Sequence, residues 1–258
     1  MRKFAAIAAL CAVLPLPGRT DAAVHAPADS TGLVDDCFYV LDGDTIFSLF
    51  IPPIELPHSG PLTDADFFEI ADSLGVEAAA IKAVVEIETG RTRAGFHSEG
   101  HPLVNFDLGL FRRAAARRRV SLAGQVQAHP EVFAPLNIRR YGSQQAAHQA
   151  RLDGAMAIDS IAAIEATFWG MFQIGGFNWQ LAGATSHEDF VRRVSRSEYD
   201  QLILFANFIR NTGLLKHLRS KNWSAFAKLY NGPGYAARGY HTRMATAYNR
   251  YKRTMNRP

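Results

Sequence analysis

The sequence is poor in cysteine, in long hydrophobic runs and in excess charge of either sign. Two of its 258 residues are cysteine, and the 20 glycines and 12 prolines show no period, so collagen-like and low-complexity classes are excluded. The 28 Lys and Arg against 24 Asp and Glu give a net charge of +4, which favours acidic polymers as partners without choosing among wall glycans, membrane surfaces and nucleic acid. With 48% hydrophobic residues, the chain can bury a sizeable core.

Residues 1–26 have the pattern of a secretory signal. Arg2 and Lys3 precede an apolar segment over residues 4–16, which is too short to cross a bilayer, and small residues suited to cleavage come after it. We therefore predict a removable signal peptide and an exported protein, periplasmic or secreted; a buried first helix is the alternative. Cys11 would leave with this signal, so the mature chain would have a lone cysteine and no internal disulfide.

Residues 27–61 differ in pattern from the residues after them. Two β-prone apolar segments, at 37–41 and 45–50, flank the dipeptide Asp42-Gly43, which suits a tight hairpin turn. Prolines then stop any further strand. We predict a short hairpin or ordered arm and a Pro-rich connector, too small to form an independent wall-binding domain.

Residues 62–258 have a helical pattern almost throughout. Thr63 and Asp66 have the spacing of a capping box that opens a helix, and Gly75 closes that helix. Further helices are expected over residues 77–88, 112–119, 143–159, 187–210 and 240–254, and from residue 223. No internal repeat is visible. The fold class is therefore mainly α, with one helical domain behind the short N-terminal hairpin or arm.

Glu88 lies on the apolar face of the second predicted helix, in its last turn. On a helical wheel it falls in the stripe of Ile81 and Val84, whereas Glu86 falls on the solvent side. Apolar neighbours and a helix C-terminus both raise the pKa of a carboxyl group. A carboxylic acid that stays protonated near neutral pH suits a general acid for a glycosidic oxygen. The alternative is a side chain that reaches water or pairs with an arginine just beyond the helix.

Two other segments combine aromatic rings, glycines and side-chain amides. They span residues 168–178 and 227–235. Glycine lets a backbone approach a ligand closely, and rings beside amides suit sugars, which offer an apolar face edged by hydroxyl groups. Taken alone, each segment also fits an ordinary core and turn.

These segments together resemble a known family. Glu-Thr-Gly at residues 88–90, Gly-Met-Phe-Gln-Ile at 170–174 and Tyr-Asn-Gly at 230–232 look like the lysozyme-like superfamily, which includes goose-type lysozymes and soluble lytic transglycosylases. The chain resembles more closely the N-acetylmuramidase family of phage endolysins and bacterial chromosomes, over about residues 62–251. The resemblance implies a lysozyme-like catalytic domain over residues 62–258 that cleaves the β-1,4 bond between N-acetylmuramic acid and N-acetylglucosamine in peptidoglycan.

The resemblance also implies the site. Glu88 is expected to be the catalytic acid, and no cofactor or metal is expected. His97 and His101 have a helical metal-binding spacing, but the glycines and proline around them disfavour a helix there. The residues expected to bind the glycan strand are Thr167, Trp169, Phe172, Gln173, Phe177, Asn178, Tyr230, Asn231 and Tyr235.

The sequence departs from the family pattern around the second carboxylate. Where the family usually reads Leu-Phe-Glu-Arg-His, this chain reads Asn-Phe-Asp-Leu-Gly at residues 105–109, and Phe168 stands where the family has Ser. Asp107 is the candidate base that would activate a water molecule and invert the sugar. If Asp107 does not serve, the sugar's own 6-hydroxyl can attack, as in a lytic transglycosylase. A non-catalytic module that binds glycan or a partner is the alternative from another class.

A basic run, with five arginines between residues 112 and 119, suggests a solvated helix face or attraction to anionic wall polymers or a membrane surface. At most peripheral membrane contact is expected. Nucleic acid is not expected as a partner, because no binding motif accompanies the run.

Overall fold

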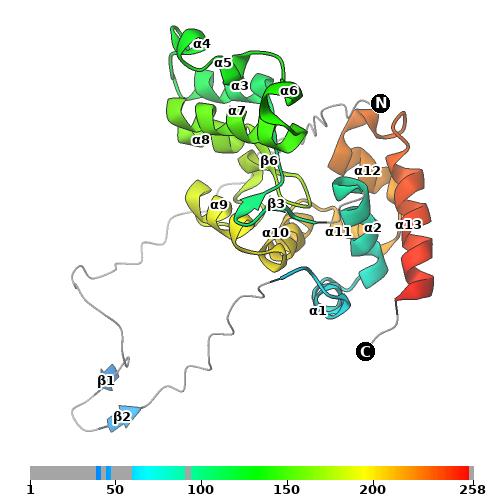
Figure 1. The fold of residues 1–258 in the computed structure, drawn as a ribbon. Helices are drawn as coiled ribbons and strands as arrows, with labels where there is room; N and C mark the ends of the chain where they lie inside the picture. The colour runs from blue at the N-terminus through cyan, green and yellow to red at the C-terminus, as the bar shows by residue number, and fades with distance from the viewer. Residues whose placement is uncertain (1–38, 42–44, 48–59, 91–93, 256–258) are drawn as a thin grey trace. The chain divides into compact units, whose positions relative to one another are not determined.

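The computed structural model describes residues 39–41, 45–47, 60–90 and 94–255 (Figure 1). The chain divides into two units, of which the smaller spans residues 12–56 and the larger holds residues 57–258. In the smaller unit, β1 (Tyr39–Leu41) pairs antiparallel with β2 (Thr45–Phe47) on either side of the expected turn. The predicted signal peptide and most of the predicted connector lie outside the described residues.

The larger unit is mainly helical, which confirms the predicted fold class. Its longer helices are α1 (Asp64–Leu74), α2 (Ala78–Thr89), α3 (Leu108–Arg117), α7 (Gln144–Ile158), α9 (His187–Arg196), α10 (Glu198–Asn211), α12 (Trp223–Asn231) and α13 (Tyr240–Thr254). Shorter helices are α4 (Gln125–Ala128), α5 (Pro130–Phe133), α6 (Ile138–Tyr141), α8 (Ser160–Glu165), α11 (Leu215–Arg219), and the 3-10 turns η1 (Gly176–Asn178) and η2 (Pro233–Tyr235). None of the helices in the described residues is long and apolar enough to cross a membrane.

Local side-chain chemistry sets the ends of several helices. At the start of α1, the Thr63 hydroxyl accepts from the Asp66 amide while the Asp66 carboxylate accepts from the Thr63 amide, so the predicted capping box is present. Gly75 ends α1 in the left-handed conformation, as predicted. The helix predicted over residues 187–210 is instead two helices. Ser197 interrupts it, because its backbone is extended and its hydroxyl caps α10 through the Asp200 amide.

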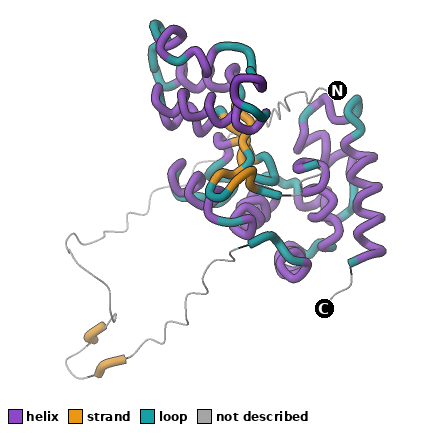
Figure 2. The backbone as a smooth tube through the Cα atoms, in the orientation of Figure 1, coloured by secondary structure: helices purple, strands orange, loops and turns teal. Residues whose placement is uncertain are grey.

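Short strands, which the helical pattern did not predict, connect the helices. β5 (Val104–Phe106) pairs with β6 (Thr167–Trp169), which pairs with β7 (Ile174–Gly175), all antiparallel. β3 (Phe96–Ser98) and β4 (His101–Pro102) form a separate hairpin. Figure 2 shows the strands between α3–α8 and the remaining helices of the larger unit. The segment 167–175 therefore connects the group α3–α8 to the helices that follow, which begin with α9.

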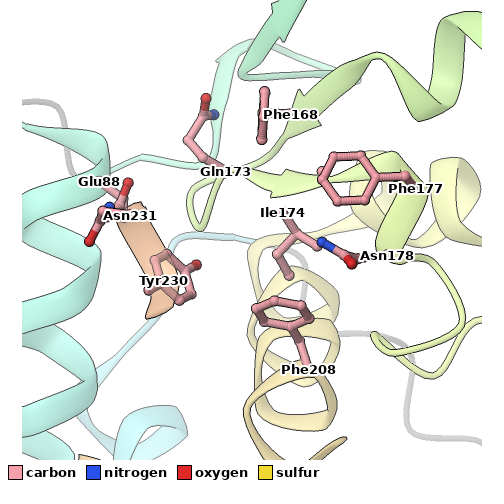
Figure 3. A pocket seen from close by; sticks show the side chains of 10 residues that line it. Glu88, Phe168, Gln173, Ile174, Phe177, Asn178, Phe208, Tyr230 and Asn231 are labelled. Atoms are coloured by element: carbon pink, nitrogen blue, oxygen red, sulfur yellow. The ribbon is translucent and has the colours of Figure 1, made fainter. Parts of the chain in front are cut away.

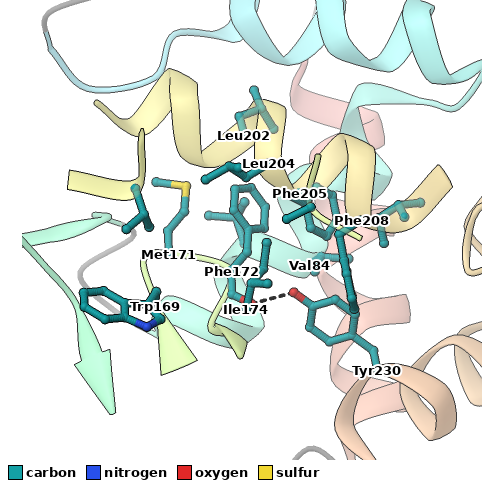
Figure 4. Packing of buried hydrophobic residues seen from close by; sticks show 14 of the residues in the cluster. Val84, Trp169, Met171, Phe172, Ile174, Leu202, Leu204, Phe205, Phe208 and Tyr230 are labelled. Carbon is teal, nitrogen blue, oxygen red and sulfur yellow. Dashed lines mark hydrogen bonds between the residues drawn. The ribbon is translucent and has the colours of Figure 1, made fainter. Parts of the chain in front are cut away.

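The core of the larger unit brings the two segments singled out in the sequence into contact with α2. Phe172 stacks on Phe205 of α10 with ring centroids 4.1 Å apart, and Phe205 meets Tyr230 of α12 edge-on (Figure 4). Val84 of α2 is fully buried in the same cluster. Because these rings are buried together, the ends of α2, β7 and α12 are held side by side.

Candidate active site

Glu88 lies in the last turn of α2, at the edge of the core. Ile81 and Val84 on the same face are fully buried, whereas the Glu88 side chain is only partly covered. Asn231, at the end of α12, donates from Nδ2 to Glu88 Oε1 at 2.8 Å (Figure 3). The acid is therefore held from one side by a neutral amide and remains open on the other.

The surroundings of Glu88 shift its titration towards neutral pH. Burial raises the pKa of Glu88 to about 7, and the Asn231 hydrogen bond and the positive charge of Arg243 oppose that rise without cancelling it. Near neutrality, a substantial fraction of the molecules therefore carry a protonated carboxyl group that can donate to a leaving oxygen.

The prediction that Glu86 faces solvent is wrong. Glu86 forms an ion pair with Arg250 and accepts a hydrogen bond from the Tyr251 hydroxyl at 2.7 Å, both from α13. Its side chain is 18% exposed, because α13 packs along the face of α2 that the isolated helix would have offered to water. The two glutamates thus differ in partners, since Glu88 meets an amide and Glu86 meets a cation.

A pocket opens beside Glu88 and joins residues from both singled-out segments (Figure 3). Six of the predicted site residues line it: Glu88, Gln173, Phe177, Asn178, Tyr230 and Asn231. Four further residues line it that were not predicted: Phe168, Ile174, Gly175 and Phe208. Phe168 and Phe177 meet edge-on with centroids 6.2 Å apart. The pocket therefore combines one carboxyl group, three amides and several aromatic rings.

The loop between β6 and β7 carries the pocket residue Gln173 in an uncommon conformation. Its φ is +48°, and its side-chain amide donates to the Gly170 carbonyl at 2.8 Å. A left-handed backbone at a residue other than glycine costs free energy and is often found at functional sites. Gln201 of α10 supports the loop, because its Oε1 accepts from the Met171 amide at 2.7 Å.

Gln201 and Glu198 are supporting residues that were not predicted from the sequence. Gln201 is 2% exposed and also donates to the Val194 carbonyl at 2.8 Å. Glu198 accepts from the amides of Leu62 and Gly95 at 3.1 and 2.6 Å. Both residues could have been found from the sequence as polar residues on the buried face of a helix. The same kind of signal identified Glu88.

Asn231 has an unused acceptor beside the acid. The residue is 3% exposed, and its Oδ1 atom is buried without a hydrogen-bond partner in the described structure. Its neighbour Tyr230 stacks on Phe226 and donates its hydroxyl to the Phe172 carbonyl at 2.5 Å. Tyr230 therefore ties α12 to the pocket loop, while Asn231 presents its amide to Glu88.

Four residues that were predicted to bind glycan lie elsewhere. Thr167 is fully buried and donates to the Ala163 carbonyl, and Trp169, 4% exposed, donates to the Ile164 carbonyl. Phe172, 1% exposed, is part of the core. Tyr235 bonds Ser224 and does not line the pocket. Core packing covers the side chains of Thr167, Trp169 and Phe172, so the structure does not expose them to a sugar.

Asp107 lies outside the pocket that holds Glu88. It follows β5 and caps α3, with Oδ1 accepting from the Leu110 amide at 2.7 Å. The described residues contain no group of three or more His, Cys, Asp and Glu side chains that could hold a metal ion. His97 and His101 belong to the β3–β4 hairpin rather than to a helix.

Comparisons with known proteins agree with this fold. The family model Muramidase, described as N-acetylmuramidase, matches residues 77–252. The crystal structure of the Burkholderia AP3 phage endolysin is similar to 75% of this chain and 71% of that chain, with 38% sequence identity and a TM-score of 0.62. No curated protein matches the chain. The chain therefore belongs to the N-acetylmuramidase family, and it is a glycoside hydrolase whose substrate is peptidoglycan.

Proposed function

We propose that this muramidase cleaves the β-1,4 bond that follows N-acetylmuramic acid, with Glu88 as its general acid. The observation that carries the proposal is the placement of Glu88, whose pKa burial raises to about 7, in the same pocket as the amides of Gln173, Asn178 and Asn231. A protonated carboxyl group beside sugar-binding amides is what protonation of a bridging oxygen requires.

The residues around Glu88 have separate tasks in this mechanism. Asn231 orients the carboxyl group through its hydrogen bond, so that the other oxygen can face the substrate. The partly exposed ring of Phe177 offers an apolar surface to a sugar face, and the partly exposed amide of Gln173 lies at the pocket wall. Glu88 gives its proton to the leaving oxygen, and the ionised form that results is stabilised by Asn231 and Arg243.

Glu88→Gln tests the proposal directly. Glutamine keeps the shape of the side chain and loses the titratable proton, so we expect the clearing of purified peptidoglycan in a zymogram to disappear while the protein remains folded. Glu99→Gln is the matched control, because Glu99 is exposed in the β3–β4 turn and does not line the pocket. Full activity of Glu88→Gln would remove Glu88 from the mechanism.

A lytic transglycosylase is the second candidate, and the placement of Asp107 favours it. Asp107 uses one carboxylate oxygen to cap α3 and does not line the pocket with Glu88. A reaction in which the sugar's own 6-hydroxyl attacks needs only Glu88, first as acid and then as base. Mass spectrometry of the products separates the two reactions, since hydrolysis leaves a reducing-end muramic acid and transglycosylation leaves an anhydro sugar.

Export is proposed from the sequence of residues 1–26, which combines a basic start with a short apolar segment. We expect the full chain to be shortened when it is expressed in a bacterium with a general secretion system. The intact mass of the protein recovered from the periplasm or medium would give the cleavage position. An uncleaved chain that stays in the cytoplasm would contradict export.

A further inference from the structure

A second depression lies near Glu88, between the end of α2 and α13. We call it the α2–α13 groove. Its lining residues are Glu86, Ile87, Gly90, Thr242, Arg243, Thr246, Ala247 and Arg250. Ile87 lies one residue before Glu88 and Gly90 two residues after it, and the charge of Arg243 acts on Glu88, so the groove lies close to the acid. Among the described residues, no atom lies within 4 Å of a Cβ atom built on Gly90.

The charges in the groove do not cancel. Arg250 is paired with Glu86, which neutralises both. Arg243 is exposed, and among the described residues no carboxylate lies within ion-pair distance of it. Its guanidinium lies 5.9 Å from the centroid of the Tyr240 ring. Within the described part of the chain, the groove therefore has one unpaired cation, and this cation is close enough to Glu88 to stabilise its ionised form.

We propose that Arg243 binds a carboxylate of the peptide branch carried by the muramic sugar, and that it thereby makes the enzyme selective for peptide-bearing glycan. This inference rests on the proposed function, because it assigns a subsite of the same active site. A guanidinium presents parallel N–H donors that match the two oxygens of a carboxylate. Peptide branches of peptidoglycan carry several carboxylates, whereas the sugar hydroxyls that suit the pocket carry no charge.

The position of the groove suits a peptide branch of the glycan rather than the glycan chain itself. The rings and amides that suit sugar rings line the pocket on the other side of Glu88. The groove instead offers the charge of Arg243, beside Thr242 and Thr246, whose hydroxyl groups donate to backbone carbonyls. A chain that leaves the glycan at the cleaved sugar can therefore enter the groove without displacing the strand.

The test compares soluble glycan strands with free carboxylates and the same strands after amidation of their carboxyl groups. We expect wild-type kcat/KM to be about tenfold higher on the native strands, equivalent to about 1.4 kcal/mol. Arg243→Gln should reduce this ratio to nearly one, mainly through a higher KM on native strands. Arg253→Gln, the same charge change at an exposed position of α13 outside the groove, should keep the wild-type ratio.

A second readout separates recognition from simple damage to the fold. Glu88 is faced by Asn231 and by the charged or titratable groups Arg243 and Tyr240. Loss of the Arg243 cation should raise the pKa of Glu88, so the alkaline limb of the rate profile should move to higher pH. Equal rates of wild type on the two substrates, or an unchanged ratio in Arg243→Gln, would overturn the subsite alone. Failure of wild type to cleave either substrate would overturn the proposed function as well.

Discussion

When Glu88 is ionised, at high pH, its charge lowers the free energy of unfolding of the protein. Its folded pKa is raised to about 7 from an ordinary value of 4.5, so the folded state binds more protons than the unfolded state between these values. The free energy of unfolding contributed by this group is therefore highest below about pH 4.5 and falls as pH rises towards 7. The loss is at most roughly 3.5 kcal/mol, because one pKa unit corresponds to about 1.4 kcal/mol.

Glu88→Gln should consequently be more stable than wild type at pH 8 and close to wild type at pH 4. Glutamine is neutral at both values, so only the wild-type protein changes charge. Thermal melts of the two proteins at both pH values measure this difference. Glu99→Gln, at an exposed site, should show no such pH-dependent gain. If the two proteins differed equally in melting temperature at pH 4 and pH 8, ionisation of Glu88 would not affect stability.

Asp107 offers a separate test, because asparagine and aspartate cap helices about equally well. Since Asp107 caps α3 and does not line the pocket, we expect Asp107→Asn to keep its melting temperature and to lose less than about tenfold in rate. Asp107→Ala should lose about 1 kcal/mol of stability with the cap. A rate loss of roughly 10²–10⁴ in Asp107→Asn would instead identify a general base.

The sequence predicted the surroundings of a residue best where neighbours along the chain determine them. The position of Glu88 follows from the apolar face of its own helix, and Ile81 and Val84 are indeed buried beside it. Glu86 could not be placed in this way, because its partners come from α13. Thr167 and Phe168 are neighbours in sequence, but adjacent residues of a strand face opposite sides. The pattern of motifs did not show which of the two faces the pocket.

At the scale of secondary-structure elements, capping residues made several helices predictable. Ser143 caps α7, and Thr63 caps α1, close to the expected boundaries. The strands β5, β6 and β7 were not expected, because two or three residues are too few to show an alternating pattern. β5 pairs with β6 from a segment more than 60 residues away, as Val104 does with Trp169, whereas β6 and β7 pair across a tight turn.

Among the contacts between elements, we expect the removal of those made by Gln201 to cost the most stability. Gln201→Leu would leave the Met171 amide and the Val194 carbonyl buried without their partner, which should lower the free energy of unfolding by about 2–4 kcal/mol. Activity should fall as well, because the loop that carries Gln173 loses its support. Urea unfolding and zymograms measure the two effects.

Gln127→Leu, at an exposed position of α4, is the matched control for that substitution and should change neither stability nor activity appreciably. If Gln201→Leu unfolded at the wild-type urea concentration, the contacts of Gln201 would not support the loop. Gln201→Glu adds a finer comparison, since it keeps an acceptor for Met171 and loses the donor to Val194.

At the scale of the whole molecule, the catalytic unit should be independent of the N-terminal segment. The family match begins at residue 77, and the larger unit holds residues 57–258. We expect a chain that lacks residues 1–56 to fold, to melt within a few degrees of the mature protein and to clear peptidoglycan in a zymogram. Loss of cleavage with an unchanged melt would instead assign the removed segment a direct part in the reaction.

The contacts of Gln201 also bear on how the active site assembles during folding. One side chain of α10 joins the Met171 amide, the Val194 carbonyl and, at 3.4 Å, the Gly95 carbonyl, and these groups come from three separate stretches of chain. A Cβ atom on Gly170, whose φ is +68°, would lie only 2.7 Å from Gln201 Oε1, so the loop docks against that amide without a side chain between them. The pocket loop therefore reaches its final form only when α10 is in place. Because the Met171 amide exchanges its hydrogen only when this contact opens, its exchange rate measures how often the loop and α10 separate as one cooperative unit.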